Sequence, residues 1–264
     1  RKAESNILWD IGKSYQAWEK YEEAILYHQQ SRFLDEQLGR ESDVATMCYW
    51  LADCYRDWGK YEQALKAGQQ GLAIRQKLDD QLEVAGAYYR LGHIYKAWNK
   101  YKDAIANYKQ SLYHYQQLNK IADVRNLYYW LSDSYKEWDK YEEALQYQQK
   151  SLGKCQELED QKSIALAYYR LGRVYQAWGK YVEAIAHYEQ SRDRYQQLDK
   201  DRYQQLDKEK DVANLWYWLG DCYREWSKYD LAIAAEQQDL AIHKKLGDQP
   251  KIALAYWQLG LTYQ

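Results

Sequence analysis

A four-residue block, Trp-x-Lys-Tyr, recurs along this chain of 264 residues. The block begins at Trp18, Trp58, Trp98, Trp138, Trp178 and Trp226, so the first four steps are 40 residues each and the last is 48. A fixed period in this range is the signature of stacked supersecondary units, each of which packs only on its neighbours. The sequence therefore predicts one elongated repeat domain that spans residues 1–264.

Within a unit the hydrophobic pattern predicts two helices joined by a tight turn. Residues 87–97 place apolar or small side chains at i, i+3, i+4 and i+7, which is the stripe of an amphipathic helix, and a second such stripe begins at Tyr101. Between them, the residue after the Trp is Gly or Asn in three units, and these residues end a helix at low cost. We predict helix pairs over residues 1–40, 41–80, 81–120, 121–160, 161–208 and 209–248, followed by a lone helix over 249–264.

The fifth unit is longer because an octapeptide is duplicated. The sequence DRYQQLDK at 193–200 is repeated at 201–208. Eight extra residues would turn a continuing helix by about 80 degrees beyond two full turns, which would move its apolar face out of register. We therefore predict a protruding helical extension or a bulged loop here, with the fifth and sixth units still packed together. Recent duplication, engineering and a cloning artefact are equally open as the origin.

The repeated residues match a known pattern. The run Leu91-Gly92-x-x-Tyr95, followed by Tyr101-x-x-Ala104-Ile105, resembles the tetratricopeptide repeat, and its skeleton recurs at Leu171 and Leu219. The 40-residue unit is similar to the long-helix subclass found in kinesin light chain and the spindle adaptor LGN. This resemblance implies an all-α, right-handed α-solenoid of six antiparallel helix pairs plus one terminal helix. It also implies that the function is the binding of proteins or peptides.

Composition and charge exclude several classes of partner. The 37 basic and 39 acidic residues nearly cancel, so nothing attracts a polyanion and we expect no nucleic-acid partner. The sequence has neither an apolar run of the roughly 20 residues that a membrane helix needs nor a signal peptide. Four cysteines lack disulfide or metal spacing, which indicates buried packing positions and a reducing, cytoplasmic location. Because the chain begins at Arg1 and stops within a unit, we expect a segment of a longer protein.

The sequence contains no motif that indicates catalysis. The five histidines do not fall at metal-ligand or nucleophile spacings, and no phosphate-binding loop is present. Adjacent carboxylates such as Glu22 and Glu23 recur where a helix begins, and negative charge is favourable there. We therefore predict a protein that is not an enzyme and has no metal and no cofactor.

The candidate binding surface is the inner, concave face, which the resemblance assigns to the first helix of each pair. One aligned line on this face is wholly aromatic: Trp9, Tyr49, Tyr89, Tyr129, Tyr169, Tyr217 and Trp257. A neighbouring line carries polar and charged side chains: Lys13, Asp53, His93, Asp133, Arg173 and Asp221. Aromatic anchors rimmed by charge are typical of protein recognition sites. The alternating charges are equally explained by ion pairs between neighbouring units, such as Lys13 with Asp53.

Two further sets of Trp residues have structural interpretations. The Trp of each Trp-x-Lys-Tyr block is expected to close the hydrophobic gap at the end of a helix pair, with the following Lys covering it. A second set, Trp50, Trp130 and Trp218, occurs only in the even units, so the array also repeats every 80 residues. Our hypothesis is that these rings fill space left by smaller or more polar residues in the second helix, such as Gly68.

Together these patterns predict a protein-interaction scaffold. We expect the concave aromatic groove to bind a helix or an extended segment from a protein or peptide partner, or from another domain of its own full-length chain. The alternatives are a self-associating assembly module and a regulatory or sensor segment of a larger signalling protein.

Overall fold

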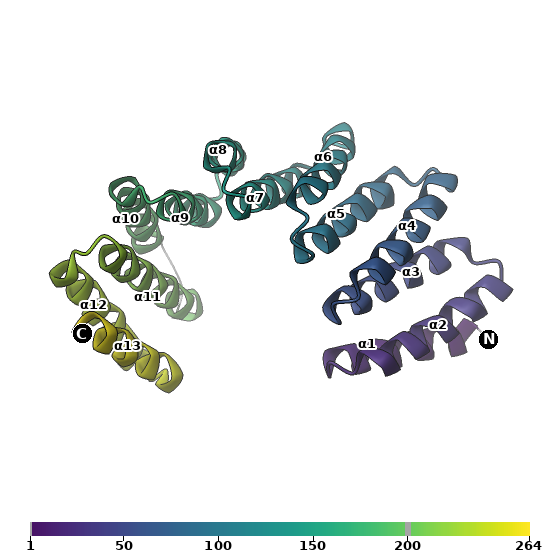
Figure 1. The fold of residues 1–264 in the computed structure, drawn as a ribbon, viewed down its shortest axis with the longest axis horizontal. Coiled ribbons are helices and arrows are strands. Elements are labelled where there is room, and N and C mark those ends of the chain that lie inside the picture. Colours follow the sequence, from purple (N-terminus) through teal and green to yellow (C-terminus); the bar gives the residue numbers. More distant parts are fainter. Residues whose placement is uncertain (1, 199–201) are drawn as a thin grey trace. The chain divides into compact units, whose positions relative to one another are not determined.

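The computed structural model describes residues 2–198 and 202–264, and it describes side chains for 2–198 and 207–264. Within these residues the chain forms thirteen α-helices and no strands (Figure 1). It falls into two compact units, Arg1–Trp138 and Asp139–Gln264. Unit 1 contains α1 (Lys2–Ala17), α2 (Tyr21–Gln37), α3 (Glu41–Asp57), α4 (Tyr61–Lys77), α5 (Gln81–Ala97), α6 (Tyr101–Gln117) and α7 (Ile121–Glu137). Unit 2 contains α8 (Tyr141–Glu157), α9 (Gln161–Ala177), α10 (Tyr181–Gln197), α11 (Arg202–Glu225), α12 (Tyr229–Leu246) and α13 (Gln249–Thr262).

Inside each unit, every helix packs against the next one along the chain. The first helices of neighbouring pairs also meet, as α3 and α5 do. Such short-range packing of antiparallel pairs is the architecture of a repeat solenoid. The predicted all-α solenoid fold class is confirmed, whereas the assignment of residues 1–264 to a single domain stays a prediction.

The turns between helices follow the sequence signals closely. The residue after each block Trp has a positive φ, including Glu19 at 58° and Gly179 at 73°. An aspartate caps α5, α9 and α13: the side chains of Asp80, Asp160 and Asp248 each accept a hydrogen bond from a backbone N–H three residues later. These caps satisfy one of the free donors at a helix N-terminus. The equivalent residues before α3 and α7 are Arg40 and Lys120, which form no side-chain cap. The predicted helix ends and acidic starts are confirmed.

The left-handed conformation of Glu19, in the turn after Trp18, can be tested by substitution. Glu19 adopts φ 58°, a conformation that costs a side-chain-bearing residue more than glycine. We expect Glu19→Gly to raise the free energy of unfolding by about 0.5 to 1 kcal/mol, measured by urea denaturation. The matched control, Glu22→Gly on the exposed first turn of α2, should lower it by about the same amount. A loss of stability in Glu19→Gly would contradict the turn account.

Small residues bring the two helices of a pair together. In the first turn of each second helix an alanine is fully buried, at positions Ala24, Ala64, Ala104, Ala144, Ala184 and Ala232. Opposite, Gly92 of α5 lies under the ring of Tyr108, so close that a Cβ there would approach a ring carbon to 2.5 Å. Gly172 and Tyr188 repeat this arrangement in unit 2. We call such a glycine, covered by the side chain sixteen residues later, the glycine notch.

The buried cysteines behave as packing residues. Cys54 and Cys222 are fully buried, as is Ser134 at the equivalent place in the fourth pair. Burial raises the pKa of both thiols to about 12, so neither is a thiolate near neutral pH. The prediction of a small-residue packing position is confirmed.

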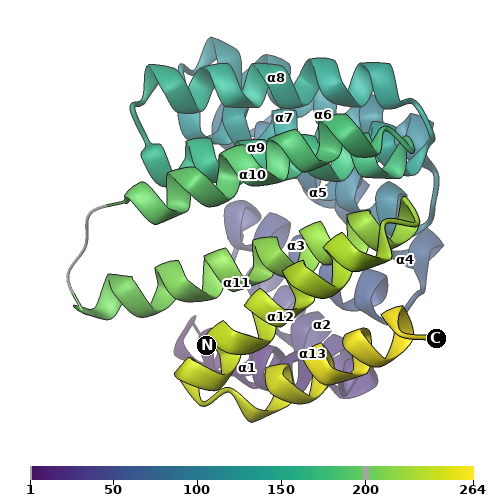
Figure 2. The same cartoon turned by 90° about the vertical axis from the view of Figure 1, so that its left-hand side faces the viewer.

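The duplicated octapeptide lengthens α11. The helix before it, α10, ends at Gln197 after 17 residues, whereas α11 has 24 residues and begins at Arg202, seven positions before the expected start at 209. Helices α10 and α11 still pack together. Figure 2 shows the N-terminal part of α11 reaching past the adjacent end of α12. The predicted helical extension is therefore present and belongs to the first helix of the sixth pair, while residues 199–201 lie outside the described residues.

Candidate functional site

The aromatic line predicted from the sequence differs in exposure along its length. Trp257 is 60% exposed, and Trp9, Tyr89, Tyr129, Tyr169 and Tyr217 are half-buried. Tyr49 is only 4% exposed because Gly71 on α4 leaves room for its ring, where a Cβ would come within 2.5 Å of a ring carbon. Burial raises the pKa of Tyr49 to about 12. Tyr49 therefore belongs to the core, and the other members of the line reach the surface.

The carboxylate of Asp53 joins two neighbouring helix pairs. It lies 2.7 Å from Arg56 on its own helix α3 and 2.6 Å from Arg90 on α5. Burial raises the pKa of this carboxyl group, and the two guanidinium groups oppose that rise. Arg90 also lies over the ring of Tyr49, 5.3 Å from its centroid. The result is a fixed Arg-Asp-Arg arrangement on the surface between α3 and α5.

The other predicted aspartates are held in similar bridges. Asp133 lies 2.7 Å from Lys96 on the preceding first helix and 3.0 Å from Lys136 on its own. These lysines hold the pKa of Asp133 below its ordinary value, although burial alone would raise it. Asp221 pairs with Arg224 and accepts a hydrogen bond from Gln176 of the preceding pair. The interpretation of these charges as links between neighbouring units is therefore supported for Asp53, Asp133 and Asp221.

Two basic residues of the same line are engaged with aromatic rings. Lys13 pairs with Asp10 at 3.0 Å and lies 3.9 Å from the centroid of the Trp9 ring. Arg173 lies 3.8 Å from the centroid of the Trp218 ring. Such cation–π contacts hold a long basic side chain against the surface. Lys13 is thus bound within its own helix, in place of the suggested pairing with Asp53.

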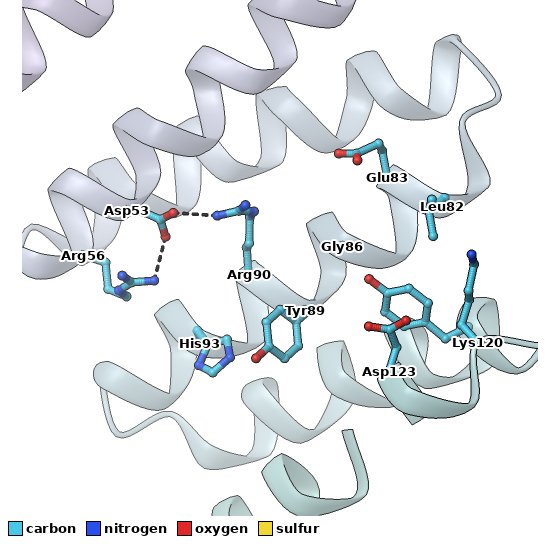
Figure 3. Close-up of a pocket in the computed structure, with 11 residues that line it drawn as sticks. Asp53, Arg56, Leu82, Glu83, Gly86, Tyr89, Arg90, His93, Lys120 and Asp123 are labelled. Carbon is cyan, nitrogen blue, oxygen red and sulfur yellow. Dashed lines mark hydrogen bonds and ion pairs between the residues drawn. The ribbon is translucent and has the colours of Figure 1, made fainter. Parts of the chain in front are cut away.

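A pocket of about 720 Å³ lies among the helices of unit 1 (Figure 3). Its lining includes Asp53 and Arg56 from α3, Tyr89, Arg90 and His93 from α5, Tyr115 from α6, and Lys120 and Asp123 at the start of α7. Three of these residues, Asp53, Tyr89 and His93, were candidates from the sequence. The structure brings them to one place because α3 and α5 are first helices of adjacent pairs.

His93 supplies a neutral ring to this pocket. Its ring contacts Tyr89 and Trp130 edge-on, with both pairs of centroids 4.4 Å apart. Burial, followed by the positive charges of Arg56 and Lys96, lowers the pKa of His93 to about 3. The imidazole is therefore uncharged at neutral pH. The pocket combines aromatic surface with a balanced set of acidic and basic side chains.

The even-unit Trp residues pack on the preceding pair. The ring of Trp50 stacks on the His28 ring, with centroids 5.9 Å apart, and contacts the Trp9 ring edge-on, with centroids 6.0 Å apart. The space beside Gly68 is filled by Leu91 of the next pair, whose methyl carbon would lie 3.0 Å from an added Cβ. The size-compensation hypothesis is therefore wrong for Gly68, because a neighbouring pair fills that space.

Some lining residues were missed from the sequence. Tyr115 lies near the end of a second helix, Lys120 lies in the following turn, and Asp123 lies in the first turn of α7. The resemblance assigned recognition to the first helices alone, so Tyr115, on a second helix, and Lys120, in a turn, were not candidates. Trp130, which packs on His93, carried a usable signal in the 80-residue period, but we interpreted that signal as packing.

Trp98 and Trp178 of the repeated block have a structural role. The ammonium groups of Lys100 and Lys180 lie 3.3 Å and 3.4 Å from the centroids of the Trp98 and Trp178 rings. Tyr61 of the preceding pair stacks on Trp98 with centroids 5.8 Å apart. Tyr141 stacks on Trp178 in the same way, so these two rings each join two pairs and are covered by their own lysines, as expected, whereas Trp18 is 67% exposed.

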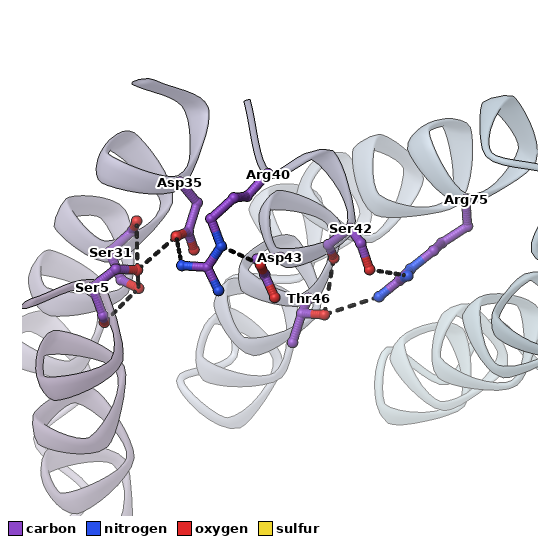
Figure 4. A network of polar contacts seen from close by, with 8 residues as sticks. All are labelled: Ser5, Ser31, Asp35, Arg40, Ser42, Asp43, Thr46 and Arg75. Atoms are coloured by element: carbon purple, nitrogen blue, oxygen red, sulfur yellow. Dashed lines mark hydrogen bonds and ion pairs between the residues drawn. The ribbon is translucent and has the colours of Figure 1, made fainter. Parts of the chain in front are cut away.

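A second polar cluster in unit 1 is held by hydrogen bonds among its own side chains (Figure 4). Ser5 donates a hydrogen bond to Asp35 at 2.8 Å, and Arg40 donates to the same carboxylate oxygen at 2.9 Å. In the next pair, Arg75 donates to Ser42 at 2.8 Å and to Thr46 at 2.9 Å. Because these hydrogen bonds join side chains of the same helix pair, we interpret the cluster as stabilising the fold.

No group of three or more His, Cys, Asp or Glu side chains in the described part of the chain could hold a metal ion. Among the described helices, none combines the length and apolar character needed to cross a bilayer.

The tetratricopeptide repeat family model matches residues 43–117 and 123–197, more than half of the chain, and a second tetratricopeptide repeat model matches 213–235. The chain belongs to the tetratricopeptide repeat family. In these terms, the pocket is formed by the second, third and fourth repeats. No curated protein matches the chain.

Three solved structures share the tetratricopeptide repeat fold. A putative kinesin light chain with nearly identical repeats, from Podosopora anserina, has a TM-score of 0.64 at 18% identity, covering 74% of this chain and 96% of that one. A Rap protein complexed with competence and sporulation factor has a TM-score of 0.57 at 15% identity, covering 98% and 75%. A signal transduction ATPase with a tetratricopeptide repeat sensor, from Pyrococcus horikoshii, has a TM-score of 0.64 at 16% identity, covering 97% and 41%.

Proposed function

We propose that this tetratricopeptide repeat chain is a protein-interaction scaffold and that the pocket of unit 1 binds a helix or an extended segment of a partner. The observation that carries the proposal is the meeting of Tyr89, His93, Tyr115 and the Arg56-Asp53-Arg90 arrangement around one open pocket. Aromatic rings supply contact area, and fixed charges at their edge select the register of a bound segment.

The size and charge of the pocket favour a peptide segment over a small ion. Its volume of about 720 Å³ admits several side chains but no folded domain. Three basic residues, Arg56, Arg90 and Lys120, face three acidic ones, Asp53, Glu83 and Asp123. A polyanion or a single carboxylate would be attracted and repelled by neighbouring groups. A segment with polar side chains of both signs beside an apolar anchor fits better.

A binding role accounts for these groups better than catalysis. The Asp53 carboxylate is occupied by two guanidinium groups, and His93 has a pKa of about 3, far below that of an effective general base. No pair of side chains in the pocket combines a free nucleophile with a base. We infer that the chain acts by binding and is not an enzyme.

The source of the segment has two candidates. The Rap structure contains competence and sporulation factor, which supports a partner supplied by a separate molecule. The signal transduction ATPase carries its repeats as a sensor within a longer chain, which supports a regulatory segment that contacts another domain of its own protein. Both candidates use the same pocket, and the following experiment applies to both.

The binding proposal is tested by selecting peptides on the whole chain from a random display library and measuring their affinity by fluorescence polarisation. Tyr89→Ala and Lys120→Glu should each weaken binding about tenfold or more, because the first removes an aromatic anchor and the second reverses an exposed charge at the pocket. The matched controls are Tyr113→Ala and Lys66→Glu, whose side chains are exposed on α6 and α4. Peptides that bind all four variants as well as the unchanged chain would refute the pocket as the binding site.

A further inference from the structure

Helix α2 exposes two large apolar side chains on one side. Leu26 is 52% exposed and Phe33 is 59% exposed, and they stand eight and fifteen residues after the block residue Trp18. We call the side of a second helix that carries these two places its outer face. On α4 these places hold Lys66 and Ala73, which are also exposed although α4 lies between two other helix pairs. A repeat before residue 1 would therefore leave the outer face of α2 uncovered.

The outer faces of the six second helices differ in the size of these two side chains. They carry Leu26 and Phe33 on α2, Lys66 and Ala73 on α4, Ala106 and Tyr113 on α6, Gln146 and Gly153 on α8, Ala186 and Asp193 on α10, and Ala234 and Ala241 on α12. Of these helices, α2 alone has a large apolar residue at both places, and α12 alone has alanine at both. The two alanines of α12 are exposed. Ala186 and Asp193 are exposed too, although the pair of α11 and α12 follows α10, so a repeat after residue 264 would leave the outer face of α12 uncovered.

One antiparallel register matches the large side chains of α2 with the small ones of α12. The two places are seven residues apart on both helices, so a register that sets Phe33 on Ala234 also sets Leu26 on Ala241. Large side chains that fill the grooves beside small ones let two helices pack closely. Between the two places, the exposed residues are glutamines on both helices, and their amides can donate to and accept from one another.

The same register also brings opposite charges together. Glu22 and Glu23 lie in the first turn of α2, and Lys244 and Lys245 lie in the last turn of α12. All four are exposed, and neither glutamate forms an ion pair within the described residues. Lys245 contacts Glu209 at 2.7 Å, yet its side chain remains 70% exposed. In the antiparallel register Glu22 faces Lys245 and Glu23 faces Lys244, so size and charge select one alignment.

We propose that the outer face of α2 docks on the outer face of α12 of a second copy of this chain. The two copies use different faces, so the contact is heterologous and each assembly keeps one free face at either end. Copies therefore add head to tail, and the assembly grows with concentration instead of stopping at a dimer. A contact between two single helices is smaller than a standard protein interface, so association is weak. These faces are separate from the pocket of unit 1.

A second copy is the favoured occupant because this chain itself supplies the complementary face. A symmetric contact between two α2 helices in the same register would set Glu23 against Glu36 and large side chains against large ones. An anionic lipid surface attracts basic residues, whereas acidic side chains flank Leu26 and Phe33 on α2. The outer face of α12 answers both the size and the charge of α2.

The test measures the mass of the whole chain by multi-angle light scattering over a range of concentrations. The mass of the unchanged chain should rise with concentration. Phe33→Glu and Ala241→Glu should each remove this rise, because each places a charge in one of the two faces. The matched controls are Tyr113→Glu and Ala73→Glu, at the equivalent exposed places of α6 and α4, which should assemble as the unchanged chain does. Circular dichroism checks that all four variants are folded.

Mixing the two variants tests the head-to-tail arrangement. Phe33→Glu keeps a working α12 face and Ala241→Glu keeps a working α2 face, so the mixture should form dimers of one copy of each and nothing larger. Tyr89→Ala should leave assembly unchanged, which separates these faces from the pocket. A chain that stays monomeric at its highest soluble concentration, a variant that still assembles alone, or a mixture that forms no dimer would each overturn the proposal.

A charge exchange tests the register. Glu23→Lys should remove the rise in mass with concentration, and adding Lys244→Glu to the same chain should restore it, because the two charges are exchanged across the contact. Failure of the second substitution to restore assembly would overturn the antiparallel alignment of α2 with α12.

Discussion

Replacing Tyr108 with alanine should lower the free energy of unfolding by about 3 to 5 kcal/mol, as is usual for truncation of a fully buried aromatic ring. The Tyr108 ring has no exposed surface, covers the glycine notch at Gly92, and contacts His93 at 5.4 Å between centroids. Its loss leaves a cavity where α5 and α6 meet, and the surrounding helix pair can close that cavity only in part. Urea denaturation followed by far-ultraviolet circular dichroism measures the change.

The matched control for this prediction is on the same helix. Tyr113 is 58% exposed on α6, so Tyr113→Ala should change the free energy of unfolding by less than about 0.5 kcal/mol. Equal effects of the two substitutions would show that the notch contact does not hold the pair together.

Acidification from pH 7 to pH 4 should lower the free energy of unfolding. His28→Tyr should make this decrease smaller by about 2 to 3 kcal/mol. His28 is fully buried, and burial, followed by the charge of Lys13, lowers the pKa of His28 to about 4. The folded state therefore binds fewer protons than the unfolded state between the unfolded pKa near 6.5 and pH 4. The stability contributed by neutral His28 is present above pH 6.5 and is lost as the pH falls.

Tyrosine is the suitable replacement because Tyr108 and Tyr188 occupy the same place in the third and fifth pairs. The substitution should leave stability at pH 7 nearly unchanged. Part of the acid sensitivity should persist, since the pKa of His93 is also lowered, to about 3. The control is His114→Tyr, at a half-buried ring that stacks on Tyr88. This variant should show the same decrease in the free energy of unfolding between pH 7 and pH 4 as the unchanged chain. Parallel pH profiles for His28→Tyr and the unchanged chain would contradict the assignment.

Local features of the fold followed from the sequence because they depend on few neighbouring residues. The positive φ at Glu19 and Gly179 was predictable from the position after the block Trp, and the cap at Asp80 from its place before a helix. The fold class followed from the 40-residue period, since each unit packs on adjacent units. The family match and the helix order confirm that reasoning.

The candidate site was harder to predict because it depends on how adjacent helices are rotated. Asp53 pairs with Arg90 across two helices, and sequence spacing alone could not choose Arg90 over Lys13. Tyr49 was predicted to lie on the binding surface but is buried, because Gly71, on another helix, leaves room for its ring. The pocket also takes residues such as Tyr115 from a second helix, where no binding role was expected. Such placements are set by packing between helices, which periodicity does not encode.

The most direct test of the central claim, that the pocket of unit 1 binds a partner segment, is photo-cross-linking. A selected peptide carrying a benzophenone beside its apolar anchor is irradiated with the whole chain, and the attachment sites are located by mass spectrometry. The account predicts attachment within residues 82–93 or 115–123, which line the pocket, and its loss in Tyr89→Ala. Attachment confined to the exposed outer residues of α4 and α6, and unchanged in Tyr89→Ala, would contradict it.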